Sequence, residues 1–302
     1  MSDPPVAAVV VAYNSAGVLP ACLAALAAQG VPAIVVDNAS SDDSAAIAQK
    51  HGARVLVSAK NCGFGRGCNF GAVATGAPFI LFVNPDCVLE KGAVAELLAA
   101  AARYPGAALF APRVRGTDGT VAFGLGTTLA PYLAKGGGTL PDGDCCVPGA
   151  SGAAFMVRAE AFAEIDGFDP NIFLYYEDDD LTRRLIDAGH SVVHVDAANA
   201  THLHGRSTAS RRGVEFLKRW HLAWSRCYVM AKYGRKPPVW RLIRRHGRHW
   251  LVAAATLRWS ALGANAGMVA GAWAWRKGRG AMERQGLPDA ATAARPTADR
   301  AK

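Results

Sequence analysis

The chain lacks a cysteine pair with metal-like spacing, a long apolar run, and more than a few acids in its last hundred residues. None of its seven cysteines forms a C-x-x-C pair, and Cys145 and Cys146 are neighbours that would not easily bridge each other. Reduced thiols in a cytoplasmic setting are the simplest interpretation. The N-terminus, MSDPPVAAVVVAYN, has no basic segment of the kind that begins a signal peptide.

Two glycine patterns that bind phosphates are also missing. A GxGxxG turn should follow the first strand of a dinucleotide-binding domain, but AYNSAG stands there. The later segment NCGFGRGCNFG (61–71) has Cys68 in place of the third glycine, and the Walker sequence is absent. The glycines of this later segment could let backbone approach a ligand or could serve only to turn the chain, and the sequence leaves both open.

Charge divides the chain into two parts. Residues 1–202 hold 12 Lys and Arg against 20 Asp and Glu, whereas residues 203–302 hold 21 against 4, so the net charges are −8 and +17. All seven tryptophans lie in the basic part. We therefore predict an acidic domain over residues 1–205, a basic Trp-rich helical region over 206–285 and a disordered tail over 286–302.

Short apolar runs alternate with helical patterns through the first 83 residues. The runs lie at 7–13, 33–37, 54–58 and 79–83, with helical patterns near 17–28, 42–51 and 66–75. This alternation predicts an α/β fold, a Rossmann-like and mainly parallel sheet with helices on both faces. Ligands bind at the carboxyl ends of such strands. The polar residues there are Tyr13, Asn14, Ser15, Asp37, Asn38, Asn61, Asn84 and Asp86, and we expect them to line one crevice.

Asp86 and a histidine further along the chain are candidate metal ligands. Asp86 follows an apolar strand and a rigid Asn84-Pro85 step. Mg²⁺ and Mn²⁺ prefer carboxylate and water oxygens, and Mn²⁺ also accepts imidazole. The segment THLHGRS (201–207) offers His202 or His204. A single Asp or His is more commonly a structural polar residue, so neither alone defines a site.

Four consecutive acids stand at the start of a predicted helix, in GFDPNIFLYYEDDDLTRR (167–184): Glu177, Asp178, Asp179 and Asp180. Their mutual repulsion must be offset by cations, helix-end donors or a reacting proton. Asp179 with Arg183 and Asp180 with Arg184 have i,i+4 spacing, which predicts structural ion pairs. Glu177 and Asp178 have no such partner within the helix, so they are the catalytic candidates, although capping of the helix is an equal alternative.

Taken together, seven segments resemble the family 2 glycosyltransferases, and most of all the bacterial rhamnosyltransferase-like branch. The segments are VVVAYNS, VDNASSD, NCGFGRGCNFG, FVNPDC, GASGAAFMVR, GFDPNIFLYYEDDDLTRR and THLHGRS, within residues 6–210. The resemblance implies a GT-A fold and a nucleotide-diphospho-sugar donor. It also implies a divalent cation, Mg²⁺ or Mn²⁺, and inversion at the anomeric carbon.

The resemblance implies roles for individual residues. The residues that would hold the base and ribose of the donor are Ala12, Tyr13, Asn14, Asp37 and Asn38. A second group matches an N-x-G-F-x-x-G-x-N pattern beside the nucleotide and comprises Asn61, Gly63, Phe64, Gly67 and Asn69. Asp86 matches the last acid of the DxD metal motif, with Asn84 in place of the first. Asp178 matches the general base, with Glu177 beside it. His202 stands five residues before Ser207, as the family's metal-facing histidine does, while His204 replaces an expected glycine.

The basic region combines an amphipathic helix with an uncharged segment. The helix presents Arg241, Arg244, Arg245 and Arg248 on one face, and residues 259–275 carry no charge. Because a membrane span needs about 20 apolar residues and this segment is shorter and contains Asn265, we favour association with the inner membrane surface. An ordinary helical subdomain packed on the catalytic domain is the alternative. Nucleic-acid binding would explain the charge but not the apolar segment.

These features favour an inverting, metal-dependent glycosyltransferase that builds a bacterial surface glycan on a membrane-bound acceptor, for example a polyprenyl-linked sugar. Rhamnose from dTDP-rhamnose is the favoured sugar. Two alternatives are a non-catalytic nucleotide-sugar-binding subunit of an assembly complex and a metal-dependent hydrolase of sugar nucleotides. Turnover would exclude the first, and slow release of free sugar without acceptor would exclude the second.

Overall fold

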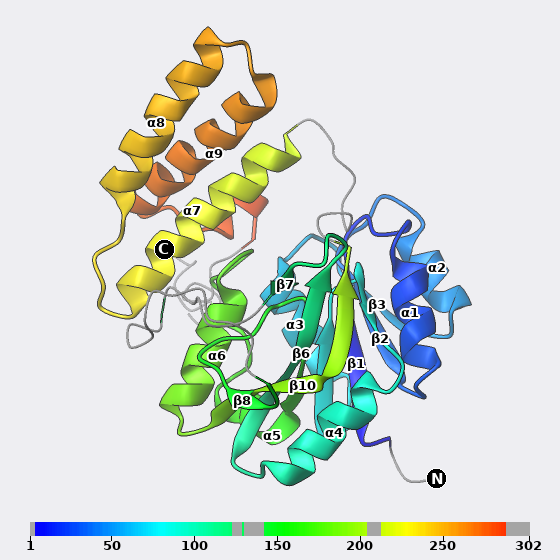
Figure 1. Ribbon diagram of the computed structural model, residues 1–302. Coiled ribbons are helices and arrows are strands. Elements are labelled where there is room, and N and C mark those ends of the chain that lie inside the picture. Colours follow the sequence, from blue (N-terminus) through cyan, green and yellow to red (C-terminus); the bar gives the residue numbers. More distant parts are fainter. Residues whose placement is uncertain (1–3, 123–128, 130–141, 204–212, 288–302) are drawn as a thin grey trace, which may run out of the picture. The chain divides into compact units, whose positions relative to one another are not determined.

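The computed structural model describes residues 4–122, 129, 142–203 and 213–287. The chain forms two compact units (Figure 1). The first comprises Met1–Asn61, Arg66–Phe168 and Asp178–Ala209, and the second comprises Cys62–Gly65, Asp169–Glu177 and Ser210–Lys302. The chain therefore passes from one unit to the other several times, and the acid run lies at one of these crossings.

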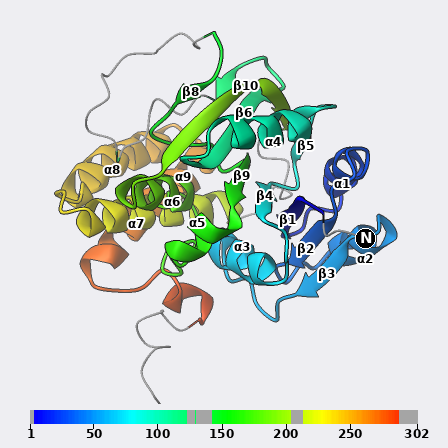
Figure 2. The same cartoon turned by 90° about the horizontal axis from the view of Figure 1, so that it is seen from below.

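Four parallel strands form the first half of the sheet, in the order β3-β2-β1-β4. They are β1 (Val6–Ala12), β2 (Ala33–Asp37), β3 (Arg54–Val57) and β4 (Phe79–Val83), and the helices between them are α1 (Leu19–Ala27), α2 (Ser44–Lys50) and α3 (Phe64–Val73). Every residue of β1 is buried, as expected for a strand covered on both faces. Figure 2 shows α1 and α3 on opposite sides of these strands.

The second half of the sheet is mixed. It continues in the order β9-β6-β10-β5, with β9 antiparallel to both of its neighbours. The strands are β5 (Cys87–Leu89), β6 (Ala107–Gly116), β7 (Val121–Ala122), β8 (Cys145–Cys146), β9 (Ala154–Arg158) and β10 (Ser191–His202), and the helices are α4 (Ala93–Arg103), α5 (Ala159–Glu164) and α6 (Glu177–Asp187). The predicted α/β class is confirmed, and the predicted early strands agree with β1 to β4 to within a residue at each end.

Four phenylalanines hold the segment that precedes the acid run. Phe168 packs against Phe82 and Phe162 with ring centroids 5.4 and 5.7 Å apart, and Phe155 lies 5.4 Å from Phe82. Phe82, Phe155 and Phe168 are almost completely buried. Aromatic contacts of this kind fix the backbone at the end of the first unit, one residue before Asp169.

The second unit contains three long helices: α7 (Val214–Lys232), α8 (Val239–Ala255) and α9 (Trp259–Arg276), followed by a turn of 3-10 helix, η2 (Glu283–Gln285). A Cβ atom on Gly267 would lie 2.4 Å from the Phe216 carbonyl oxygen, and one on Gly271 would lie 2.1 Å from that of Trp220. The backbones of α7 and α9 therefore meet directly at these glycines. The helical C-terminal extension predicted from the sequence is confirmed.

The middle of the uncharged segment 259–275 is thus packed within the helical unit, and its association with a membrane surface stays a prediction. Gly267, Met268, Gly271 and Ala272 are buried within the helical unit. Asn265 Oδ1 accepts a hydrogen bond from Nδ1 of His246 on α8 (2.8 Å). None of the described helices has the length and apolarity needed to cross a bilayer. The predicted disordered tail lies, from residue 288 on, outside the described residues.

Candidate active site

The ends of β1 and β2 are joined by hydrogen bonds among the residues predicted to hold the donor. The Asn38 backbone N–H donates to the Ala12 carbonyl oxygen (2.8 Å), and the Asn38 side chain donates to Asn61 Oδ1 (3.0 Å). Asp37 is buried, and its Oδ2 accepts a bond from the Ser40 N–H (3.3 Å). Within the described part of the chain, Oδ1 of Asp37 has no hydrogen-bond partner. A buried acceptor of this kind suits a ligand hydroxyl.

The turn after β1 is held against the loop after β2. Asn14 adopts a left-handed conformation (φ 53°), its N–H donates to Ser40 Oγ (3.0 Å), and its Oδ1 accepts from the Ser41 N–H (2.8 Å). Asn tolerates this conformation better than most residues. Tyr13, beside it, is exposed. The two loops thus form one structure at the carboxyl end of the parallel strands.

The glycine-rich segment makes close contacts within the protein. Gly63 has φ 86°, and a Cβ there would lie 2.3 Å from the Phe173 carbonyl oxygen, which accepts a bond from the Phe64 N–H (3.0 Å). A Cβ on Gly67 would lie 2.9 Å from Val11 of β1. The close approach of neighbouring atoms therefore requires glycine at both positions. The sequence did not suggest that Gly67 packs against β1. A role beside a nucleotide stays a prediction for both.

Asn69 makes a paired contact with the backbone of Phe168. Its Nδ2 donates to the Phe168 carbonyl oxygen (2.9 Å), and its Oδ1 accepts from the Phe168 N–H (2.9 Å). A carboxamide can satisfy both groups at once, which a carboxylate cannot. Asn69 of α3 therefore fixes the residue before the acid-run loop, while its predicted place beside the nucleotide stays a prediction.

Asp86 and His202, which are 116 residues apart in sequence, lie side by side. His202 Nε2 is 3.1 Å from Asp86 Oδ1, and Asp86 is buried. The pairing of β5 with β10 brings them together, since His202 stands opposite Cys87 in the antiparallel ladder. The Leu203 N–H also donates to the Asp86 carbonyl oxygen (2.9 Å). His204, the other histidine considered, lies outside the described residues.

A carboxylate oxygen beside an imidazole nitrogen fits Mn²⁺, and a carboxylate alone fits Mg²⁺. Among the described residues no group of three or more His, Cys, Asp or Glu completes a protein cage. Such a cation commonly shares its coordination with water and substrate phosphates, so a small protein ligand set is compatible with it. Burial, and secondarily the Asp86 charge, raise the pKa of the nearby Cys22 to about 12. Cys22 therefore stays a thiol and supplies no thiolate ligand.

Asp178, in the first turn of α6, is held by two backbone donors. The Gly152 N–H donates to Oδ2 (2.8 Å) and the Asp179 N–H to Oδ1 (2.9 Å). A Cβ on Gly152 would lie 3.0 Å from Oδ2, so glycine permits this close approach. Although part of its surface is open to solvent, protein atoms surround the carboxylate, and this burial raises the pKa of Asp178 against the opposing effect of the two N–H bonds. A carboxylate with raised proton affinity suits a general base.

Asp86 and Asp178 are connected through the β4–β9 pair. Val83 at the end of β4 stands opposite Ala154 at the start of β9, and the Asn84 N–H donates to the Ala153 carbonyl oxygen (2.8 Å). Gly152, the residue before Ala153, donates its N–H to Asp178 Oδ2. The segment that carries Asp86 and the segment that holds Asp178 therefore meet at the same end of these strands. The sequence had placed the GASGAAFMVR segment in the family pattern without assigning a role to Gly152.

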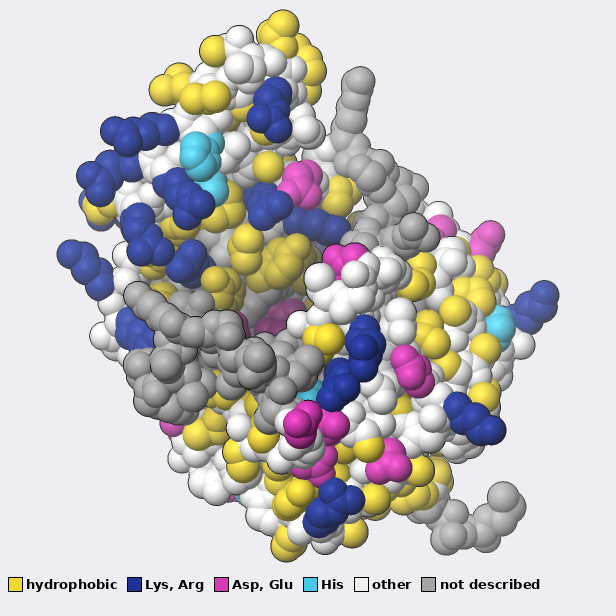
Figure 3. All heavy atoms as spheres, in the orientation of Figure 1, with side chains coloured by type: hydrophobic (Ala, Val, Ile, Leu, Met, Phe, Trp, Pro, Cys, Tyr) yellow, Lys and Arg dark blue, Asp and Glu magenta, His cyan; other side chains and the backbone are white. Residues whose placement is uncertain are grey.

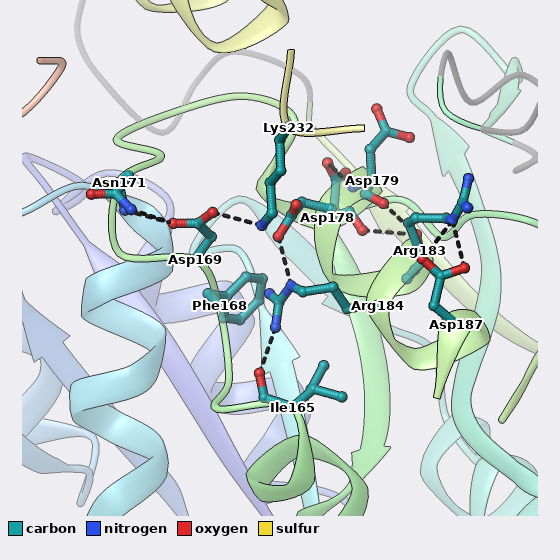
Figure 4. Close-up of polar contacts among 12 residues, drawn as sticks. Ile165, Phe168, Asp169, Asn171, Asp178, Asp179, Arg183, Arg184, Asp187 and Lys232 are labelled. Atoms are coloured by element: carbon teal, nitrogen blue, oxygen red, sulfur yellow. Dashed lines mark hydrogen bonds and ion pairs between the residues drawn. The ribbon is translucent and has the colours of Figure 1, made fainter. Parts of the chain in front are cut away.

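Among the other acids of the run, Asp180 has a structural role. Asp180 is fully buried, and Arg184 Nε donates to its Oδ2 (2.8 Å). Arg184 also donates to the Ile165 carbonyl oxygen (2.6 Å), as Figure 4 shows. The predicted Asp180–Arg184 pair is confirmed. Arg183 forms its salt bridge with Asp187, four residues further on. Glu177 is buried at the start of the helix, and its catalytic role stays a prediction.

The sequence did not reveal the ion pair that anchors the loop before the acid run. Lys232 Nζ of α7 lies 2.6 Å from Asp169 Oδ2, and the Asn171 N–H donates to Asp169 Oδ1 (Figure 4). The Tyr228 hydroxyl also donates to Asp169 Oδ2 (2.9 Å). Burial alone would raise the pKa of Asp169, but Lys232, Asn171 and Tyr228 together hold it below its usual range. The α7 partners of Asp169 are about sixty residues further along the chain, so no local sequence pattern identified this aspartate.

Further contacts with α7 hold the same loop in an unusual conformation. Ser225 Oγ donates to the Leu174 carbonyl oxygen (2.9 Å), and Phe173 stacks on His221 with ring centroids 4.3 Å apart. Tyr175 and Tyr176 have φ of 68° and 69°, which bulky residues rarely adopt without support from surrounding structure. The loop that ends at Glu177 is therefore shaped by α7.

The sequence matches Glycosyl transferase family 2 over residues 7–166, and the chain belongs to this family of enzymes. It is 31% identical over 209 residues to an N-acetylglucosaminyl-diphospho-decaprenol L-rhamnosyltransferase of Mycobacterium tuberculosis, which covers 59% of this chain and 68% of the relative. An uncharacterized glycosyltransferase of Mycobacterium bovis is 36% identical over 99 residues, covering 33% of this chain and 44% of the relative.

Solved glycosyltransferase structures share the fold. A mannosyltransferase from Pyrobaculum calidifontis, in complex with GDP-Man and Mn²⁺, has a TM-score of 0.56 at 13% identity and covers 91% of this chain and 88% of its own. Staphylococcus aureus TarS 1–349, in complex with UDP, has a TM-score of 0.54 at 14% identity, with coverages of 91% and 92%. GalNAc-T7 has a TM-score of 0.53 at 15% identity, and the match covers 66% of this chain but only 43% of that protein. The predicted GT-A fold is confirmed.

Proposed function

We propose that this family 2 glycosyltransferase is an inverting, metal-dependent enzyme that transfers a sugar from a nucleotide-diphospho-sugar to a hydroxyl group of a glycan or lipid-linked acceptor. The favoured donor is dTDP-rhamnose and the setting is bacterial cell-surface polysaccharide synthesis. One observation carries the proposal: the segment that carries Asp86, the partner of His202, and the segment that holds Asp178 meet at the same end of the β4–β9 pair. A cation site and a base on neighbouring segments are what sugar transfer from a diphosphate needs.

The donor would bind at the carboxyl ends of β1 and β2. Asp37 offers its open Oδ1 to a ribose hydroxyl, and Asn38 and Asn14 shape the surrounding loops. Asp86 and His202 would hold Mg²⁺ or Mn²⁺. Asn84, which stands in place of the first acid of the DxD motif, would bind the donor. When bound, the cation stabilises the charge that develops on the departing diphosphate. The roles of Ala12, Tyr13, Asn61, Gly63, Phe64, Gly67 and Asn69 beside the nucleotide belong to this proposal.

Asp178 would act as the general base, with Glu177 next to it. As the acceptor oxygen bonds to the anomeric carbon, the bond from that carbon to the diphosphate breaks and the hydroxyl proton moves to the Asp178 carboxylate. Attack from the face opposite the leaving group inverts the configuration, by the logic of inverting glycosidases with the acceptor in place of water. The Gly152 and Asp179 N–H groups keep the carboxylate in position for this proton.

The acceptor class comes from the relative in Mycobacterium tuberculosis, whose name specifies a diphospho-decaprenol carrier. We infer a polyprenyl-linked sugar as acceptor and action at the inner face of the cell membrane. In this proposal residues 1–205 form the donor-binding and catalytic domain, and residues 206–285 form the membrane-associating region. Nucleic acid has no part in it.

The test is transfer by the purified full chain, with Mg²⁺, a panel of dTDP-, UDP- and GDP-sugars, and N-acetylglucosaminyl-diphospho-polyprenol in detergent. Mass spectrometry detects the extended lipid, and saturation-transfer NMR measures donor binding with and without EDTA. A rhamnosylated lipid formed only with Mg²⁺ supports the proposal. Binding without turnover would favour the non-catalytic subunit, and rapid release of free sugar without acceptor would favour the hydrolase.

A further inference from the structure

Large apolar side chains are exposed where α8 ends and α9 begins. This group, which we name the hairpin tip, comprises Trp250, Leu251, Val252, Leu257 and Trp259. Their exposed fractions lie between 40% and 75%. Several large apolar side chains exposed together at one end of a unit indicate an interaction site more commonly than ordinary surface.

The hairpin tip is not used for packing within the helical unit. The buried side of α9 contacts α7 through Gly267 and Gly271, and the buried side of α8 uses Val239, Leu242 and Ala253. Leu257 lies in the short link between α8 and α9, with a left-handed backbone (φ 53°), and is left in solvent. Figure 1 shows this link at the end of the α8–α9 pair.

The surface around the tip is strongly basic. Residues 216–282 contain 14 Lys and Arg and no Asp or Glu. Arg241, Arg244, Arg245 and Arg248 are exposed along α8, and Arg258 stands within the tip. Figure 3 shows apolar side chains gathered at the end of the helical unit and Lys and Arg side chains along its flank.

We propose that the hairpin tip inserts into the headgroup region of an anionic lipid bilayer, with the arginines of α8 on the surrounding lipid phosphates. Trp at the interface, aliphatic groups below it and cations around them match the chemistry of that layer. A polyanion such as nucleic acid would match the arginines but leave the apolar groups in water. A second copy of this chain would place like charges together. The proposal deepens the proposed function, because it names the surface that brings the site to a lipid-linked acceptor.

The experiment is flotation of the full chain with vesicles of phosphatidylcholine, with or without about one third phosphatidylglycerol, a fraction at which the surface potential becomes strongly negative. The tip variant carries Leu251→Ser, Val252→Ser, Leu257→Asn and Trp259→Gln, all at exposed positions, and Asn is compatible with the left-handed backbone at residue 257. The matched control carries Val57→Ser and Val73→Ser, which are equally exposed in the α/β unit. Circular dichroism melting checks that each variant folds.

The full chain should float with anionic vesicles, and the tip variant should partition about tenfold more weakly or worse because its apolar contacts are gone. Arg244→Gln with Arg248→Gln should also weaken binding, by an amount that shrinks at high salt, while Lys50→Gln with Lys91→Gln should not. Brominated lipids should quench tryptophan fluorescence less in Trp259→Gln than in the full chain.

Three results would overturn the proposal: a full chain that stays unbound, a tip variant that floats like its control, or a dimer that light scattering detects and the tip substitutions dissolve. Flotation uses neither donor nor acceptor, so it is independent of catalysis. If the proposed function fails, donor binding and transfer are lost while flotation remains. If only the tip proposal fails, the tip variant still binds donor in solution as the full chain does.

Discussion

At the scale of single residues, Asp178 combines burial that favours its protonated form with two backbone N–H groups that favour its charged form. Burial has the larger effect, so its pKa is raised above 3.8. A proposed base with this character holds a proton more strongly than an ordinary aspartate.

The rate of transfer should therefore fall on the acid side at a higher pH than an unperturbed aspartate would give. Because the base must be ionised, activity is present above the raised pKa of Asp178 and is lost as the pH falls through it. The measurement is kcat/KM for transfer from pH 4 to about pH 8, the range in which a raised carboxylate titrates. Asp178→Asn should lower kcat by about a hundredfold or more and abolish this acid limb, with donor binding unchanged. Full activity in that variant would remove the assignment.

The contact between Asp86 and His202 predicts a second residue-level result. Asp86→Ala should weaken donor binding in the presence of Mg²⁺ or Mn²⁺ and leave the weak cation-independent binding unchanged, because the cation would link the carboxylate to the diphosphate. Titration calorimetry with and without EDTA measures this difference. Asp43→Ala, an exposed acid in the same unit, is the control. Equal cation dependence in Asp86→Ala and the control would contradict the metal assignment.

At the scale of helices and loops, the salt bridge between Lys232 and Asp169 joins α7 to the loop that ends at Glu177. Lys232→Met leaves a buried carboxylate without its cation and should cost about 3 kcal/mol of unfolding free energy. The folded state lowers the pKa of Asp169, so this contribution is present above 3.8 and is lost as the pH falls through the lowered pKa. Urea unfolding at neutral and acid pH, with Lys236→Met as control, should show a cost that shrinks in acid.

The glycines of α9 give a matched pair of substitutions. Gly271→Ala places a Cβ 2.1 Å from the Trp220 carbonyl oxygen, whereas a Cβ on Gly263 meets nothing within 4 Å. Gly263→Ala should therefore stabilise the helix by up to about 1 kcal/mol, because alanine has the higher helix propensity. Gly271→Ala should lower the melting temperature, since α7 and α9 must separate. Equal melting temperatures for the two variants would show that the α7–α9 contact is looser than described.

The elements differed in how well the sequence predicted them. Strands β1 to β4 were predictable because each is a continuous apolar run covered on both faces, a local signal. The position of β9 between β4 and β6 was not, since its partners are decided by pairing across more than forty residues. Asp86 and His202 were predicted together through the family pattern. Asp169 was missed because a buried aspartate with a distant lysine partner looks like any other loop acid in a sequence.

At the scale of the whole molecule, the second unit takes in two short segments, Cys62–Gly65 and Asp169–Glu177, besides the C-terminal helices. A chain ending at residue 209 keeps every residue of the proposed site but loses the α7 contacts of loop 169–177. Its transfer activity should be lost, whereas a chain ending at residue 287 should keep it. Transfer assays of both chains, with donor binding measured in parallel, make the comparison. Activity in the shorter chain would mean that α7 has no part in shaping the site.

The direct backbone contact of α9 with α7 through Gly267 and Gly271 also has a consequence for the timing of activity during synthesis. The proposed base is followed by nearly a hundred residues before α9 is complete at Arg276. While those residues are still on the ribosome, α7 lacks its partner α9, and we expect it to support the left-handed conformation of the loop only weakly. We expect the nascent chain to fold its sheet early and to become an active enzyme only after α9 has left the ribosome, so that sugar nucleotides are not consumed before the helical unit has formed.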